Sequence, residues 1–138
     1  MYNYLSESYG SLYRTTAPWG IYSSNITSVV IGDGVKGIGN YAFYYCKNIT
    51  EVSIGADVVS IAQNAFSNCY YLTDVTIPAN VKSMGRYVFA YCTRLNSVSI
   101  GNGITEIPAY AFRDCGKLSS VNIPETERKP LFVTGAAI

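Results

Sequence analysis

The chain has 138 residues, a formal net charge of +1 and no histidine. Its length and apolar content suit one domain with a buried core, and its nearly neutral charge disfavours a nucleic-acid partner, because phosphate binding depends on clustered Lys and Arg. The lack of histidine excludes His-based acid–base catalysis, Ser-His and Cys-His nucleophile pairs and most zinc sites. No apolar run reaches the roughly 18 residues of a membrane span, so we expect none.

Residues 1–25 precede a regular sequence repeat and are interpreted as an N-terminal cap. One period before Phe43, the first phenylalanine of the repeat, lies Gly20, beside Trp19. The end of a stacked core needs a cover. We therefore predict that Trp19, together with Ile21, covers the exposed end of the phenylalanine row.

From residue 26 onward, eight apolar columns recur with a period of 23 and without a gap. A repeat this short cannot bury its own apolar face, but stacked copies can, so the period predicts a solenoid. Full repeats are predicted at 26–48, 49–71, 72–94 and 95–117, with a partial repeat at 118–124. The two most distinctive columns are Phe43, Phe66, Phe89 and Phe112, and Cys46, Cys69, Cys92 and Cys115.

Each repeat reads L-x-x-V-x-I followed by a Gly or Pro, and later A-F-x-x-C, with small departures. The alternation in V-x-I predicts a short strand, and A-F-x-x-C predicts a single helical or 3-10 turn on the return path. The fold class predicted is a right-handed α/β-type solenoid. A parallel sheet of about five strands would line its concave face, with irregular or 3-10 turns on the convex side.

The stretch 72–77 matches the L-x-x-L-x-L signature of leucine-rich repeats, and Asn80 matches the usual Asn. With A-F-x-x-C and the period of 23, the segment 26–124 resembles the BspA-like leucine-rich repeats, and Ala17-Pro-Trp19 is similar to the segment before the first repeat in many bacterial members. This resemblance implies a cell-surface or secreted protein that adheres to a protein or glycan of a host or neighbouring cell. No signal peptide is recognisable in this chain.

Residues 125–138 form a C-terminal tail in which the repeat columns lose their apolar residues. The apolar stretch 131–133 is out of register with the columns. The fifth strand, within 118–123, would therefore have an open edge, which is a template for pairing. We expect either this tail or a second molecule to cover that edge.

Two surfaces are candidates for ligand binding, and we favour the concave face. Its side chains are small and polar and do not support the core, and Glu51 and Asp74 share one strand position in neighbouring repeats. The predicted concave residues are Ser28, Val30, Glu51, Ser53, Asp74, Thr76, Ser97, Ser99, Ser120 and Asn122.

The alternative surface is rich in tyrosines that flank the buried A-F and C positions. Exposed aromatic side chains are enriched in contact surfaces. Tyr41, Tyr87 and Tyr110 share one column, which Asn64 breaks. The alternative binding residues are Tyr45, Tyr70, Tyr71 and Tyr91.

The remaining motifs do not indicate catalysis or a cofactor. The cysteines form a row that does not converge, so we predict buried free thiols and neither disulfides nor a metal site. The G-x-G-x-x-G match at 32–37 falls in a repeat turn with no long helix after it, so no nucleotide site is expected. We predict an interaction module and not an enzyme; the alternative is a structural or self-assembling repeat unit without a dedicated ligand.

Overall fold

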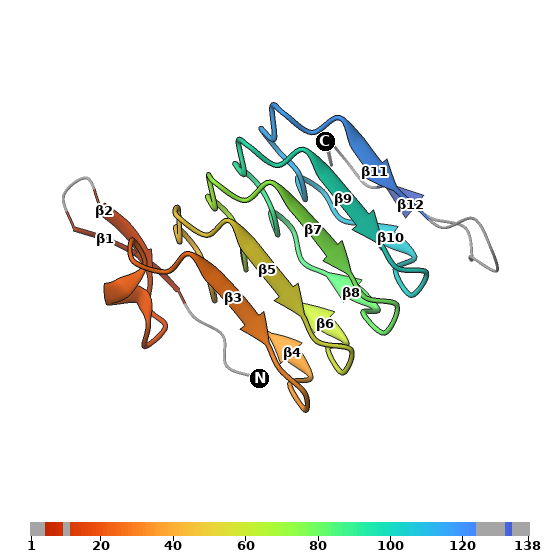
Figure 1. Cartoon of the computed structure of the whole chain (residues 1–138), viewed down its shortest axis with the longest axis horizontal. Helices are drawn as coiled ribbons and strands as arrows, with labels where there is room; N and C mark the ends of the chain where they lie inside the picture. Colours follow the sequence, from red (N-terminus) through yellow and green to blue (C-terminus); the bar gives the residue numbers. More distant parts are fainter. Residues whose placement is uncertain (1–4, 10–11, 124–131, 134–138) are drawn as a thin grey trace.

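The computed structural model describes residues 5–9, 12–123 and 132–133. Within them the chain winds as a β-solenoid, and its coils build two rows of parallel strands (Figure 1). The first strand row holds β3 (Ser28–Ile31), β5 (Glu51–Ile54), β7 (Asp74–Ile77), β9 (Ser97–Ile100) and β11 (Ser120–Asn122). The second strand row holds β4 (Gly37–Ile38), β6 (Ser60–Ile61), β8 (Ser83–Met84), β10 (Glu106–Ile107) and β12 (Phe132–Val133).

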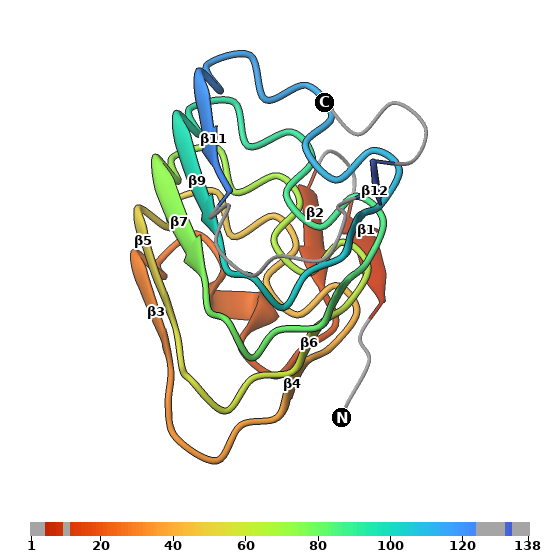
Figure 2. The ribbon, with the colours of Figure 1, turned by 90° about the vertical axis from the view of Figure 1, so that its right-hand side faces the viewer.

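The two strand rows lie on different sides of the solenoid, and the turns that follow the second row close each coil (Figure 2). Each ladder in the first row pairs a residue with the equivalent residue of the neighbouring repeat, for example Val29 with Val52. The register of these ladders therefore equals the sequence period. The predicted parallel sheet is present, whereas the second strand row was not predicted.

The four phenylalanines of the repeat form a continuous stack through the core. Successive ring centroids lie 5.2, 5.4 and 5.9 Å apart, with interplanar angles between 4° and 11°. Phe66 and Phe89 are completely buried, and Phe112 is nearly so. Since each inner ring is covered by the rings of its two neighbours, the burial depends on the stacking of copies, as expected for a solenoid.

The N-terminal part consists of an antiparallel hairpin and a short helix. The hairpin pairs β1 (Ser6–Tyr9) with β2 (Leu12–Thr15), and the 3-10 helix η1 (Gly20–Tyr22) follows. Ile21 lies in this helix and is 62% exposed. The prediction that Ile21 helps to cover the phenylalanine row is therefore wrong, because its side chain faces away from the core.

Trp19 covers the first ring of the stack, as predicted. Its ring lies 5.3 Å from that of Phe43, and its indole Nε1 donates a hydrogen bond to the Ala42 carbonyl at 2.7 Å. One repeat later the equivalent carbonyl, that of Ala65, accepts from the backbone N–H of Phe43 at 2.7 Å. Trp19 thus supplies both the aromatic face and the N–H that a preceding repeat would supply.

Two gaps in the strand ladders coincide with prolines. Gly101, the residue after β9, donates its N–H to the preceding repeat at 2.8 Å, and Gly85, the residue after β8, does the same. Pro78 holds the first position after β7 and Pro108 the first after β10, and a proline has no N–H to donate. No ladder joins β5 to β7 or β8 to β10 among the described strands.

The A-F-x-x-C segment folds as consecutive turns, in which an N–H bonds to a carbonyl one turn earlier, such as Cys46 to Phe43 at 3.1 Å. A helix cannot continue there because Tyr41 and Tyr45 have φ angles of 58° and 59°, in the left-handed region. The helical turn is therefore not confirmed. The α/β label is not confirmed either, since η1, a single short 3-10 helix, is the only helix in the described residues.

The tail strand β12 pairs in parallel with β10, with Phe132 opposite Glu106. The offset between these partners is larger than the repeat period, consistent with the loss of register in the tail. The tail strand therefore extends the second strand row and does not cover β11, which pairs only with β9 within the described residues. The rest of the predicted tail, 125–131 and 134–138, lies outside the described residues.

The four cysteines are free and buried, as predicted. Three of the thiols also donate hydrogen bonds that the sequence did not suggest; that of Cys92 donates to the Phe66 carbonyl at 3.2 Å, and that of Cys115 donates to the Phe89 carbonyl at 3.1 Å. Burial raises the pKa of Cys46 and of Cys115 to about 12.

Candidate functional site

The predicted concave residues occupy the outward positions of the first strand row. Along β7, Asp74 and Thr76 are exposed while Val75 and Ile77 are buried, because successive side chains of a strand point to opposite faces. The same alternation leaves all ten predicted residues exposed or half-buried. The five strands of the row lie side by side (Figure 1), so these outward positions share one face.

The acidic residues of this face lie on strands that share no ladder. Glu51 is opposite Ser28 on β3, and Asp74 is opposite Ser97 on β9. The Asp74 carboxylate also accepts a hydrogen bond from the Thr73 hydroxyl at 3.0 Å. The face thus offers carboxylate and hydroxyl groups to a ligand, spread along the solenoid.

A hollow of about 250 Å³ opens at the ends of β7 and β9. Three of the predicted residues line it, Thr76, Ser99 and Asn122, together with apolar atoms around Pro78. This hollow is a concave part of the predicted face. It combines hydroxyl and amide groups with an apolar floor.

The turns that close each coil after the second strand row, which we call the tyrosine side, have an unusual backbone. Each repeat places two residues other than glycine in the left-handed region, with φ between 55° and 63°. This conformation is costly for most residues, and Asn and Asp tolerate it best. The positions are Tyr41, Asn64, Tyr87 and Tyr110 in one column, and Tyr45, Asn68, Tyr91 and Asp114 in the other.

Hydrogen bonds between repeats hold this backbone in place. Every second N–H of the segment points to the next repeat: Tyr41 donates to the Gln63 carbonyl at 3.0 Å, and Tyr45 donates to the Ser67 carbonyl at 3.0 Å. Asn64 makes the same bond to the Arg86 carbonyl at 3.1 Å. The backbone that carries these side chains is therefore held in position by hydrogen bonds between repeats.

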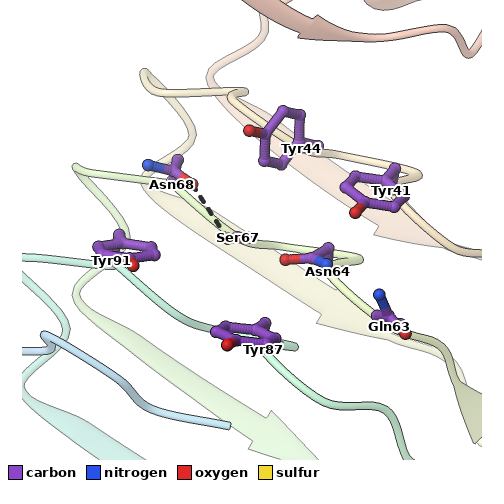
Figure 3. A pocket seen from close by; sticks show the side chains of 8 residues that line it. All are labelled: Tyr41, Tyr44, Gln63, Asn64, Ser67, Asn68, Tyr87 and Tyr91. Atoms are coloured by element: carbon purple, nitrogen blue, oxygen red, sulfur yellow. Dashed lines mark hydrogen bonds between the residues drawn. The ribbon is translucent and has the colours of Figure 1, made fainter. Parts of the chain in front are cut away.

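Asn64 and Asn68 interrupt both columns in the same repeat. Because an asparagine side chain is much shorter than a tyrosine side chain, a hollow of about 260 Å³ opens there. Figure 3 shows Asn64 between Tyr41 and Tyr87. We call this hollow the notch; its lining residues are Tyr41, Tyr44, Gln63, Asn64, Ser67, Asn68, Tyr87 and Tyr91.

The notch has tyrosine walls and an uncharged polar floor. The buried Ser67 hydroxyl donates to the Asn68 Oδ1 atom at 3.0 Å, and the Asn68 Nδ2 atom donates to the Tyr70 hydroxyl at 3.1 Å. These bonds fix the Asn68 amide and leave it one N–H and one oxygen lone pair. The amides of Gln63 and Asn64 form no side-chain hydrogen bond with any other described residue.

The four tyrosines predicted as the alternative site do not form a single cluster. Tyr91 lines the notch, and Tyr70 supports the notch through Asn68. Tyr45 packs edge-on against Tyr70 at 5.8 Å, whereas Tyr71 lies under the Arg94 guanidinium, 4.1 Å from it.

Sequence reasoning missed most of the notch. It omitted Gln63, Ser67 and Asn68, and it named Tyr41 and Tyr87 only as members of a column. The signal in the sequence was the Asn64 break in that column, together with the matching break at Asn68. Reading the two breaks as one feature would have located the hollow.

Among the described residues, no three His, Cys, Asp or Glu side chains are grouped so that they could hold a metal ion. None of the helices in the described part of the chain has the length and apolar character needed to cross a membrane.

Known structures of bacterial repeat proteins share this fold. The pneumococcal vaccine antigen PcpA is 27% identical over 74% of the chain, with a TM-score of 0.68. A leucine-rich-repeat protein from Eubacterium ventriosum is 24% identical over 86%, with a TM-score of 0.67. A leucine-rich cell-surface protein from Faecalibacterium prausnitzii is 23% identical over 78%, with a TM-score of 0.56. The chain spans only 26%, 32% and 37% of these three structures.

Sequence comparison gives the family. No curated protein matches the chain significantly. A family model described as "BspA type Leucine rich repeat region (6 copies)" matches residues 21–129, which include every Phe and Cys of the stacked core. The sequence period, the parallel strand rows and this match agree, and the chain belongs to the BspA-type leucine-rich-repeat family.

Proposed function

We propose that the chain is an interaction module of a bacterial cell-surface protein and binds a protein or a glycan of a host or neighbouring cell. The observation that carries this proposal is the outward face of the first strand row. Its side chains are held at fixed spacing by buried neighbours, yet they have no part in the core. Repeat proteins generally bind through such extended surfaces.

Two further facts support a surface location and a role other than catalysis. The similar structures include proteins named as a vaccine antigen and as a cell-surface protein. The outward polar side chains are small hydroxyls, an amide and two carboxylates on neighbouring repeats, with no nucleophile paired to a base.

Binding to immobilised mucin glycans and matrix proteins tests this function. We expect the wild-type chain to bind at least one member of the panel. The double variant Glu51→Lys, Asp74→Lys should weaken that binding and leave the free energy of unfolding within about 1 kcal/mol. The matched pair Tyr70→Ser, Tyr91→Ser tests the tyrosine side; loss of binding in this pair alone, at unchanged stability, would move the site there. Failure of the wild-type chain to bind any member would contradict the proposal.

A self-assembling repeat unit is the second candidate. Strand β11 has an outer edge without a ladder partner among the described residues, and open parallel edges template association. Sedimentation at increasing protein concentration would separate the candidates. Concentration-dependent oligomers in a chain that binds no panel member would favour assembly.

A further inference from the structure

We infer that the notch is a binding site for one neutral pyranose ring. This inference goes beyond the proposed function, because it assigns a ligand class to a second surface, on the tyrosine side and not on the first strand row. The notch is hollow because one repeat carries Asn64 and Asn68 where both of its neighbours carry tyrosine, so the site is built by the sequence and is local to one repeat.

The spacing of the walls suits a single ring. Where two tyrosines are adjacent in the same column, Tyr87 and Tyr110, their rings stack at 5.0 Å with an interplanar angle of 17°. Tyr41 and Tyr87 are two repeats apart, so their separation is roughly 10 Å, or two strand spacings. A six-membered ring placed over Asn64 would therefore lie about 5 Å from each wall, which is a normal stacking distance.

The polar groups of the notch suit hydroxyl groups better than ions. None of the eight lining side chains is charged. The amides of Gln63, Asn64 and Asn68 retain both donor and acceptor capacity, and a sugar hydroxyl uses both at once. The tyrosine walls would contact the C–H faces of the ring, and the amide floor would bind its hydroxyls.

The backbone of the notch argues against a peptide ligand. A peptide that adds to a sheet pairs with free main-chain groups. Here the N–H of Asn64 is bonded to the Arg86 carbonyl at 3.1 Å, and that of Asn68 is bonded to the Ala90 carbonyl at 2.8 Å. These two N–H groups are therefore not available to an added strand, and the side chains of the notch are the groups left to recognise a ligand at Asn64 and Asn68.

The size of the notch limits the affinity. A hollow of about 260 Å³ lies just below the roughly 300–1,000 Å³ typical of small-molecule sites, so it holds one ring and leaves the rest of a glycan in solvent. A ligand of about a dozen heavy atoms in an open site binds with a dissociation constant on the order of millimolar. Useful avidity would then come from several such contacts on one glycan-coated surface.

Saturation-transfer NMR with the whole chain and a panel of methyl pyranosides tests the inference. The probes are the methyl glycosides of glucose, galactose, mannose and N-acetylglucosamine. We expect at least one of them to receive saturation on its ring C–H protons. The filling variant Asn64→Tyr, Asn68→Tyr should weaken its binding at least tenfold and still fold, because tyrosine already occupies both positions in the first and third repeats.

The matched control is Asp114→Tyr, which adds a tyrosine to the same left-handed column outside the notch and should leave binding unchanged. If no pyranoside binds, or if binding survives in the filled variant, the inference is overturned. A dimer that dissociates when the notch is filled would identify a second copy as the occupant and would overturn it as well.

Discussion

Replacement of Phe66 by alanine tests whether the stack is the core of the protein. The Phe66 ring is completely buried between those of Phe43, at 5.2 Å, and Phe89, at 5.4 Å. Removal of the Phe66 ring leaves a cavity between the rings of Phe43 and Phe89, which belong to the repeats on either side. Backbone bonds between the repeats, such as Phe66 to the Val88 carbonyl at 2.9 Å, limit collapse of that cavity. We therefore expect a loss of about 3–5 kcal/mol in the free energy of unfolding.

Phe112→Ala is the matched comparison. Phe112 is also buried, at 1% exposure, but among the described residues its ring stacks only on that of Phe89, at 5.9 Å. An aromatic pair adds about 0.5–1.5 kcal/mol beyond burial. Since Phe66 loses two pairs and Phe112 one, Phe112→Ala should cost less by about that amount. Val30→Ala, at a side chain 76% exposed, is the surface control and should change stability by less than about 0.5 kcal/mol.

Urea unfolding followed by far-UV circular dichroism measures these differences. The slope of the transition must stay constant across the variants, because a change would indicate that some repeats unfold separately. Losses below about 1 kcal/mol at both phenylalanines would refute the stacked core. A loss at Phe112 equal to or larger than that at Phe66 would refute the two-sided stacking argument.

The packing of the repeats leads to four more predictions. The four thiols should react slowly with a thiol reagent in the native protein, and all four should react in denaturant without added reductant. Two or fewer reactive thiols in denaturant would indicate a disulfide. Burial raises the pKa of Cys46 and of Cys115 to about 12, so the protonated thiols favour the folded state. Their contribution to the free energy of unfolding is complete below about pH 9 and is lost as pH rises toward 12, which urea unfolding at several pH values would measure. Gly85→Ala would clash with the backbone of the preceding repeat and cost more than about 1 kcal/mol by thermal unfolding, whereas Gly32→Ala enters open space and should be nearly neutral. Deletion of 126–138 removes β12 and uncovers the β10 edge, so oligomeric state or solubility should change; unchanged monomers in sedimentation would contradict any capping role.

The core could be predicted from the sequence because the apolar positions that recur every 23 residues are the positions that stack on one another. A fully buried position such as Phe66 admits few side chains, so its identity recurs in every copy. The second strand row could not be predicted in the same way. Its strands are only as long as Ser60–Ile61, which is too short to show alternation.

The left-handed columns escaped prediction because Tyr41 and Tyr45 are not residue types that favour a positive φ. Their identity says little about the backbone. The repeat with Asn64 and Asn68 is a better indicator of the left-handed backbone, since asparagine tolerates this conformation best. Differences between copies within one chain therefore mark the notch, whereas the residues that the copies share mark the core.

The gap between β5 and β7 lies between the repeat that contains Asn64 and Asn68 and the repeat that follows it. Pro78 removes a ladder bond on the first strand row, yet β6 and β8 remain paired on the second row. On the tyrosine side, Asn68 still bonds to the next repeat at 2.8 Å, and the core stack continues from Phe66 to Phe89 at 5.4 Å. Up to four connections thus join neighbouring repeats: a ladder in each of the two strand rows, one set of turns and one pair of stacked rings. Because loss of one connection leaves three, the solenoid accommodates a proline on one face and two asparagines on another without losing the register of either.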